Sequence, residues 1–535
     1  MNSATECNNN ELNALTDSIM CKVQTVQQKT KESRRCSFRL TPTATYRQLI
    51  MVILANLGIV ATGMGLGFPA VSLNQLTDSD QDFHMTSSQA SWFASINAIS
   101  CPLGGLLSGY LLDSLGRKKT ILSFNLISIF SWGLMIFRIS SNNNVILIQI
   151  MISRFLIGIS TGLASSPAGV YSAEICHSSL RGRLTLGTSI ATAFGIMLIY
   201  ILGYFIRNDY QLISTIVCGY SIISIICCFP IRESPVWLLS KNMYDESLNN
   251  LKYFRGVKKN DNTDYDEIKN ELDELQRAVP HRTSKREFKE TIGRPEIYKP
   301  LLIMIGFFGF QQFSGIFVVI VYAVQFSIEA GVSIDPLLCA ILIGLTRIVT
   351  TFLVGIILDK WGRRPPAMIS ASGMAISMFL LAASTWFPEV IGKIPYITVI
   401  SIVTYIFTST LGLMTLPFSM ISEVFPPSAR GQCAGITICC GYLMSFVAIK
   451  LYPGMVSSIG NENVFAFYGL VSLLAIVYVY IYLPETKGKT LKQIEDHFKN
   501  KSSSDSQCSG IEAKCSVYLL DVFYTVFPPK MYSTN

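Results

Sequence analysis

Two adjacent amide side chains are the first candidates for chemistry in this sequence. Gln311 and Gln312 lie in the middle of a long apolar run, and Ser314 and Gly315 follow after Phe313. Amides are costly in lipid unless they face water, a ligand or a partner helix. The pair therefore predicts a hydrogen-bonding site for a neutral solute or, as the simpler alternative, a contact that joins two helices. The serine and glycine would let the chain bend or approach that site closely.

The second candidates are acidic and basic residues that occur twice, in the same order, in the two halves of the chain. They are Asp113, Arg117, Glu174 and Arg181 in the first half and Asp359, Arg363, Arg364, Glu423 and Arg430 in the second. The offset is 246 residues for the aspartates (359 minus 113) and 249 for the glutamates (423 minus 174), which indicates a duplicated unit. At a membrane edge the lower dielectric would strengthen ion pairs among them. Basic residues alone could merely set the topology, but carboxylates contribute little to topology, so the repeat favours ion pairs.

Arg347 is a third candidate because it is a charge at depth. It precedes Asp359 by twelve residues, which is about 18 Å along a helix and too far for its head group to reach that edge. A buried arginine must meet water, carbonyl groups or an acid. Arg347 could bind sugar hydroxyls, recognise an anionic substrate or brace the helices, and binding and bracing rank about equally.

Membrane-spanning helices must position all of these residues. Half of the 535 residues are hydrophobic, only 15% are charged and the mean hydropathy is +0.41, whereas a soluble chain carries about 25% charged residues. This composition argues against a large soluble enzyme. Apolar runs long enough to cross a bilayer are expected at 48–70, 89–112, 119–139, 145–168, 186–206, 211–231, 299–326, 335–358, 366–386, 396–422, 431–452 and 464–483.

The chain divides around one long polar insertion. We expect a cytosolic tail (1–47), a first six-helix bundle (48–231), a linker (232–298), a second six-helix bundle (299–483) and a second cytosolic tail (484–535). Apolar residues at helical spacing predict short amphipathic helices at 244–254 and 265–279. A solvated, charged linker is the alternative.

The formal net charge of +8 is expected to orient the chain and not to bind nucleic acid. Basic residues concentrate in the loops on one side, which predicts that this side and both termini are cytosolic. The first 48 residues are polar, so the first span is expected to be retained and not cleaved as a signal peptide. None of the 14 cysteines falls in a predicted outer loop, and disulfides, metals and cofactors are not expected.

Several ordered motifs carry a family resemblance. Beside the repeated charges stand Arg154-Phe-Leu-Ile-Gly158, Pro167-Ala-Gly-Val-Tyr-Ser-Ala-Glu174, Glu233-Ser-Pro235, Gln311-Gln312-Phe-Ser-Gly315 and Pro484-Glu-Thr-Lys-Gly488. Over residues 48–490 this set resembles the sugar porters of the major facilitator superfamily. Within that family, Gly63-Met-Gly-Leu-Gly-Phe-Pro-Ala70 and the turn Leu115-Gly-Arg-Lys-Lys119 look most like the insect facilitated trehalose-transporter branch.

The resemblance implies an all-α membrane protein with the major facilitator fold and twelve transmembrane helices. It also implies facilitative transport of trehalose or a hexose such as glucose, by alternating access, in a monomer of the plasma membrane without a cofactor. In the family the repeated charges form an inter-bundle network that closes the inner gate. Three alternatives stay open: a proton-coupled symporter, a transporter-like nutrient sensor, and a carrier of a different, anionic solute. Passive transport is favoured over symport, because no acid or histidine lies in the expected pathway.

Several positions depart from the family's substrate site. Beside Gln311 and Gln312, the candidate site residues are Ser189, Phe317, Arg347, Phe418, Gly441 and Ser445. Phe418 takes the position of a tryptophan, and the other five take positions of asparagine or glutamine. The resemblance therefore implies a less polar pocket than that of a typical hexose carrier. Val236 replaces an arginine of the family's motif, and we hypothesise that Arg232 substitutes for it.

Overall fold

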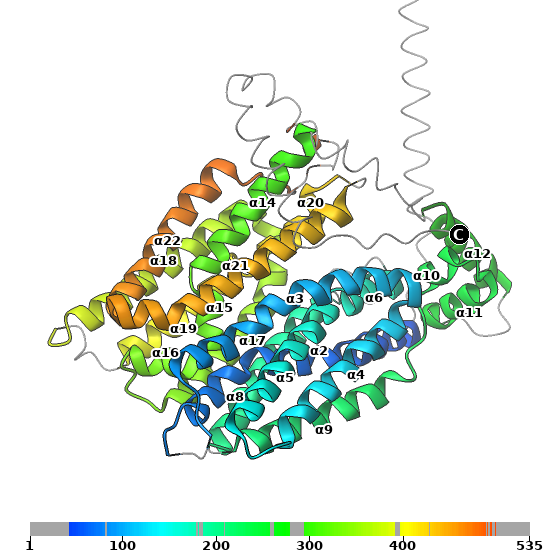
Figure 1. The fold of residues 1–535 in the computed structure, drawn as a ribbon. Coiled ribbons are helices and arrows are strands. Elements are labelled where there is room, and N and C mark those ends of the chain that lie inside the picture. Colours follow the sequence, from blue (N-terminus) through cyan, green and yellow to red (C-terminus); the bar gives the residue numbers. More distant parts are fainter. Residues whose placement is uncertain are drawn as a thin grey trace, which may run out of the picture.

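The computed structural model describes residues 42–80, 83–177, 180, 184, 186–207, 209–256, 262–278, 294–390, 396–426, 429–487, 489, 493–494 and 498. The first bundle contains α2 (Pro42–Leu76), α3 (Ser87–Leu115), α4 (Arg117–Ile136), α5 (Asn143–Ala164), α6 (Pro167–Ile175), α8 (Gly187–Phe205) and α9 (Tyr210–Cys228). The linker contains α10 (Pro235–Ser240), α11 (Tyr244–Arg255) and α12 (Asn262–Ala278). The second bundle contains α14 (Pro295–Phe313), α15 (Ile316–Val321), α16 (Ala323–Glu329), α17 (Pro336–Trp361), α18 (Arg364–Trp386), α19 (Ile397–Leu411), α20 (Leu416–Val424), α21 (Arg430–Ile459) and α22 (Asn461–Tyr482) (Figure 1).

These helices make twelve spans. Eleven helical segments of the described chain are long and apolar enough to cross a membrane; one of them combines α5 and α6, and another combines α19 and α20. The remaining span is the seventh, which the structure divides into α14, α15 and α16. The helix breaks at Gly315, whose φ of 92° suits glycine, and a Cβ there would come within 2.9 Å of the Tyr468 ring.

Helices pack closely within each bundle, and two helix pairs make the most extensive contacts between the bundles. In the first bundle α2 packs against α8, and a Cβ on Gly63 would lie only 2.3 Å from the Thr192 carbonyl oxygen. Such close approach requires small residues, as is typical of membrane helices. Across the bundles, α3 packs against α21 and α8 against α17.

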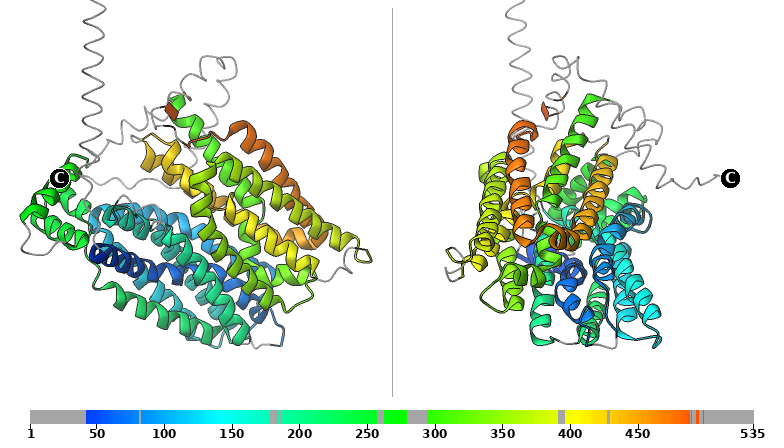
Figure 2. Two further views of the ribbon diagram at one scale, coloured as in Figure 1. Left: turned by 180° about the vertical axis from the view of Figure 1, so that it is seen from behind. Right: turned by 60° about the vertical axis from the view of Figure 1, so that its left-hand side comes forward.

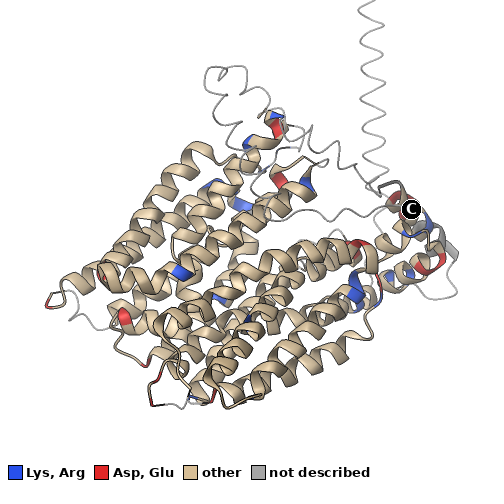
Figure 3. Ribbon diagram, in the orientation of Figure 1, with Lys and Arg blue, Asp and Glu red and all other residues tan. Residues whose placement is uncertain are grey.

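The two bundles lie side by side and come apart towards the end that carries the linker (Figure 2). We call the end that carries the linker the linker end; it also holds the turns at Gly116 and Gly362. The opposite end, where α3 begins and α21 ends, is called the far end. Charged residues gather mainly at the linker end, while most of the helical surface carries none (Figure 3).

The linker helices dock on the first bundle. Gln48 of α2 donates its amide N–H to the Phe254 carbonyl at 2.9 Å, and its amide oxygen accepts the backbone N–H of His177. Arg255 pairs with Glu271 of α12 at 2.5 Å and also donates to the Ile175 carbonyl at the end of α6. Helices α11 and α12 lie where the sequence predicts short amphipathic helices, at 244–254 and 265–279. Helix α10 was not predicted, although Ser234, which caps it, and Pro235 are ordinary helix-start residues.

Candidate functional site

The two broken helices of the second bundle hold each other at their breaks. Gln311 of α14 donates to the carbonyl of Met414, in the break between α19 and α20, at 2.9 Å. In return, the hydroxyl of Tyr405 in α19 donates to the carbonyl of Ser314, in the break after α14, at 2.8 Å. Gln311 and Tyr405 are fully buried. Each break frees a carbonyl that water cannot reach, and a side chain from the other helix pairs with it.

Gln312 keeps one unused polar atom. Its amide N–H donates to Gln311 Oε1 at 3.3 Å, but its own Oε1 is buried and has no hydrogen-bond partner. An unpaired buried acceptor costs free energy, so this oxygen is available to a donor that enters from outside, such as a hydroxyl group.

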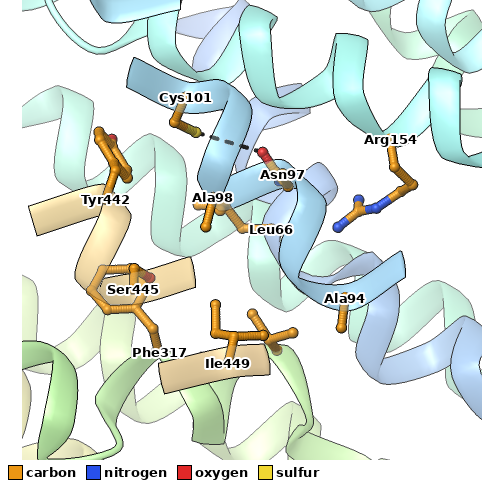
Figure 4. Close-up of a pocket in the computed structure, with 11 residues that line it drawn as sticks. Leu66, Ala94, Asn97, Ala98, Cys101, Arg154, Phe317, Tyr442, Ser445 and Ile449 are labelled. Atoms are coloured by element: carbon orange, nitrogen blue, oxygen red, sulfur yellow. Dashed lines mark hydrogen bonds between the residues drawn. The ribbon is translucent and has the colours of Figure 1, made fainter. Parts of the chain in front are cut away.

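A pocket lies between the bundles near the middle of the helices (Figure 4). The first bundle lines it with Asn97, Cys101 and Arg154, among others, and the second with Phe317, Tyr442, Ser445 and Ile449. The lining is mostly apolar, with hydroxyl and amide groups and aromatic rings facing one another across the pocket. The structure thus brings two predicted site residues, Phe317 and Ser445, into one cavity.

Two further candidates meet on the linker side of the second bundle. The Phe418 ring packs edge-on against Phe308, with 5.0 Å between centroids, and a Cβ on Gly441 would lie 2.7 Å from the same Phe308 ring. Phe418 is 42% exposed, so this aromatic residue is only partly covered by the protein. Ser189 is exposed near the start of α8 and is not among the residues that line the pocket.

Arg154 and Arg347 are both buried, but only Arg154 is held by the fold. Arg154 donates to the carbonyls of Gly65 and Phe93, which ties α5 to α2 and α3. Arg347 is 8% exposed in α17, within electrostatic range of Tyr200 in α8, and its Nη1 has no hydrogen-bond partner. Arg347 therefore sits where the two bundles meet and carries an unsatisfied donor.

Two of the repeated charges of the first half, Arg117 and Glu174, form a cluster with Glu233 at the linker end. Arg117 donates from Nε and Nη2 to the two oxygens of Glu174, at 2.8 and 2.5 Å. The carboxylate of Glu233 accepts the backbone N–H groups of Arg117 at 2.9 Å and Lys118 at 3.1 Å, which are the first donors of α4. Gly116 makes this possible: its φ is 94°, and a Cβ would lie 2.5 Å from Glu233 Oε2.

The second half repeats this cluster. Arg363 pairs with Glu423 at 2.7 Å, and Glu485 accepts the backbone N–H groups of Arg363 and Arg364 at the start of α18. Gly362 has a φ of 84°. Burial pushes the pKa of the Glu485 carboxyl upward, but hydrogen bonds from the backbone N–H groups of residues 363, 364, 486 and 487 outweigh it and leave this pKa below its ordinary value.

Sequence reasoning did not assign Glu233 and Glu485 to the charged clusters, although a signal existed. They are 252 residues apart (485 minus 233), close to the offsets of the other repeated charges, and each precedes a hydroxyl residue, Ser234 or Thr486. Glu233 and Glu485 each follow the last span of their bundle and are remote in sequence from the helix start that they cap. Comparing the two halves only over the spans therefore misses them.

The other predicted gate residues have different partners. Arg232 lies over the Tyr253 ring at 4.2 Å and donates to the Asn250 side chain, so it contacts α11. Arg364 and Arg430 donate to backbone carbonyls, of Val479 and Phe425 respectively. Asp113 is exposed; Arg181 and the side chain of Asp359 lie outside what the structure describes. Among the described ion pairs at the linker end, Arg117–Glu174 and Arg363–Glu423 each lie within one bundle and Arg255–Glu271 lies within the linker. A bridge between bundles therefore stays a prediction for another conformation.

At the far end, polar contacts cross from bundle to bundle. Lys450 of α21 donates to Ser91 Oγ of α3 at 2.7 Å, and its ammonium lies 4.3 Å from the centroid of the Trp92 ring. On the other side of the interface, Arg207 after α8 pairs with Asp335 before α17. The bundles are therefore fastened to each other at the far end.

The comparisons with known proteins agree with this architecture. The family model described as "Sugar (and other) transporter" matches residues 17–498. A "Facilitated trehalose transporter Tret1" of Culex quinquefasciatus is 30% identical over 84% of this chain and 86% of its own length. One of Apis mellifera ligustica is 28% identical over 88% and 90%.

Among solved structures, the partially occluded, inward-open xylose transporter XylE from E. coli has a TM-score of 0.69. It is 23% identical, over 83% of this chain and all of that one, and this likeness establishes the shared fold. No group of three or more histidine, cysteine, aspartate or glutamate side chains in the described residues could hold a metal ion. The match over residues 17–498 and the likeness to the trehalose transporters show that the protein is a transporter that belongs to the Sugar (and other) transporter family.

Proposed function

We propose that this protein carries trehalose or a hexose such as glucose across the membrane by facilitated diffusion. The main support for this proposal is the pocket between the bundles, whose eleven lining residues include only one charged side chain, Arg154. A sugar needs neutral donors and acceptors and an apolar surface for its ring, inside a largely apolar cavity. The trehalose transporters among its relatives support the same class of substrate.

The proposed binding residues have different parts in this site. Ser445 and Phe317 line the pocket directly and supply a hydroxyl and a ring. Gln312 offers its unpaired oxygen to a sugar hydroxyl, while Gln311 fixes the break that places it. Phe418 and Gly441 contact the Phe308 ring and shape the linker side of the site. Ser189, which is exposed outside the pocket, contacts the substrate as it passes the linker side.

Alternating access follows from the distribution of contacts. With the linker end in the cytosol, where basic loop residues are favoured, contacts across the far end make this conformation inward-facing. In the opposite conformation, the charged residues of the two linker-end clusters exchange partners across the bundles and close the inner gate. Both termini are then cytosolic, and the protein works as a monomer in the plasma membrane.

Passive transport is preferred to symport because the pocket lining contains no acid or histidine that could carry a proton. Uptake of labelled trehalose and glucose into oocytes, with and without a pH gradient, tests the proposal. We expect saturable uptake of at least one sugar, without an inward current. If neither sugar enters while the protein is abundant at the surface, the sugar-carrier proposal fails.

Arg347 favours one second candidate, a carrier of an anionic solute. Its buried, unpaired Nη1 would gain an ionic partner from a carboxylate or phosphate group of a substrate. Inhibition of sugar uptake by an excess of a hexuronate, lost in an Arg347→Gln variant, would support this candidate. Equal inhibition of both proteins, or none, would exclude it.

A further inference from the structure

Three basic side chains lie at one corner of the first bundle, beside the cluster of Glu233 and away from the pocket. The guanidinium carbons of Arg47 and Arg232 lie 4.7 and 4.2 Å from the centroid of the same ring, that of Tyr253. Lys118 donates to the carbonyl of Phe229, three residues before Arg232, at 2.7 Å. The three come from the starts of α2 and α4 and from the segment after α9, so the fold gathers them from distant parts of the chain.

Each of these cations is held by a neutral oxygen or a ring. Arg47 donates to the Tyr253 carbonyl, Arg232 to the Asn250 side chain and Lys118 to the Phe229 carbonyl, and none belongs to an ion pair of the described residues. The adjacent acid, Glu233, is already engaged by three backbone N–H groups, including those at the start of α4. Three positive charges thus lie here without an ion pair among the described residues, and the single nearby carboxylate of Glu233 leaves the corner with a net positive charge.

The surface beside this corner is apolar. Leu49 and Ile53 of α2 are 40% and 51% exposed, and Ile226 and Phe229 at the end of α9 are each 60% exposed. Helices α2 and α9 pack against each other along a seam that starts near the basic corner, and both helices carry these exposed apolar side chains at that end. Exposed apolar residues on a membrane helix face acyl chains, and a basic group at the head of such a seam lies at the depth of lipid head groups.

We propose that this corner is a binding site for an anionic phospholipid of the leaflet at the linker end. The phosphate and acidic head group lie among Arg47, Lys118 and Arg232, and one acyl chain lies along the seam of α2 and α9. Since Tyr253 belongs to α11, the bound lipid also joins the linker to the bundle. The site is independent of the transported solute.

Native mass spectrometry of the delipidated full-length protein in detergent tests the site. The probes are dioleoyl phosphatidylserine and dioleoyl phosphatidylcholine, titrated separately. We expect the wild type to bind phosphatidylserine preferentially. Each cation removed should weaken that binding about fivefold, so the triple variant Arg47→Gln, Lys118→Gln, Arg232→Gln should lose about 100-fold.

Matched variants separate the site from general charge and from folding. The control triple variant Lys269→Gln, Lys299→Gln, Lys360→Gln removes the same charge elsewhere on the linker side and should bind within about twofold of wild type. Arg47→Lys with Arg232→Lys keeps the charges and should retain most binding even if packing on Tyr253 changes. Soluble glycerophosphoserine should not displace the lipid, because the acyl seam contributes to binding. Equal loss in both triple variants, equal binding of phosphatidylcholine, or displacement by glycerophosphoserine would overturn the proposal.

Discussion

Lys450 offers the sharpest test of the contacts that fasten the far end. Replacing it with methionine keeps most of the side-chain length but removes the charge that contacts Ser91 and the Trp92 ring. These contacts join α21 to α3, so they exist only while the far end is closed. The variant should therefore destabilise this conformation relative to the one that opens at the far end.

The size of the effect follows from the geometry. A cation 4.3 Å from an indole centroid at a partly exposed site contributes about 0.5–1 kcal/mol. The 2.7 Å hydrogen bond from the ammonium adds about 1.5 kcal/mol. A total of about 2 kcal/mol changes the equilibrium constant about 30-fold, which would raise a conformation populated at about 1% to about one quarter.

Distances between spin labels at Ser79 and Ser457 measure this shift, because both residues are exposed near the far end and belong to different bundles. Labels attached through a genetically encoded ketone side chain leave the native cysteines in place. The Lys450→Met protein should show a second, longer distance that Lys450→Arg does not show. An unchanged distance distribution in Lys450→Met would refute the reasoning, since the contacts would then carry no conformational free energy.

Three more predictions concern the linker-end clusters and the broken helices. Gly362→Ala must adopt a φ of 84° and place a Cβ 2.9 Å from Glu485, so its thermal midpoint should fall by an amount equivalent to about 2 kcal/mol, whereas Gly435→Ala, which meets nothing, should not destabilise. Hydrogen bonding holds the pKa of Glu485 below its ordinary value, so the stability that its carboxylate adds is fully present above the usual glutamate pKa. This stability is lost as the pH falls through the folded-state pKa of Glu485. The difference in thermal midpoint between wild type and Glu485→Gln should therefore be largest near neutral pH and vanish in acid. Gln311→Leu leaves the Met414 carbonyl unpaired and should reduce sugar uptake at least tenfold at equal surface abundance, and unchanged uptake would contradict its part in the site.

The fold was accessible from the sequence because lipid imposes a simple rule on length and polarity. Predicted spans such as 366–386 and 464–483 fall on α18 (Arg364–Trp386) and α22 (Asn461–Tyr482) within a few residues. The division of the seventh span was only partly foreseen. Ser314 and Gly315 indicated a bend, but the second division, at Tyr322, has no local sequence signal and depends on packing.

The candidate site was predicted less completely, because side-chain partners depend on the conformation. The pairing of Arg117 with Glu174 fits the repeat in the sequence. The contact of Arg232 with Tyr253 does not, since it requires knowing that α11 docks beside the segment that follows α9. The sequence spacing placed Arg347 deep in the membrane. Only the three-dimensional structure shows that it lies on α17, which packs against α8, and that its Nη1 has no hydrogen-bond partner.

The exchange of hydrogen bonds between the two broken helices constrains how this protein can vary. Gln311 pairs with the carbonyl at the other helix's break, and Tyr405 does the same for the break after α14. A substitution that straightened one helix would withdraw a donor from the other and leave a bare carbonyl in a dry interior. The two breaks are therefore expected to occur together in related sequences. A relative without one break would need a compensating change at the other, and functional variants that lack only one break should be rare.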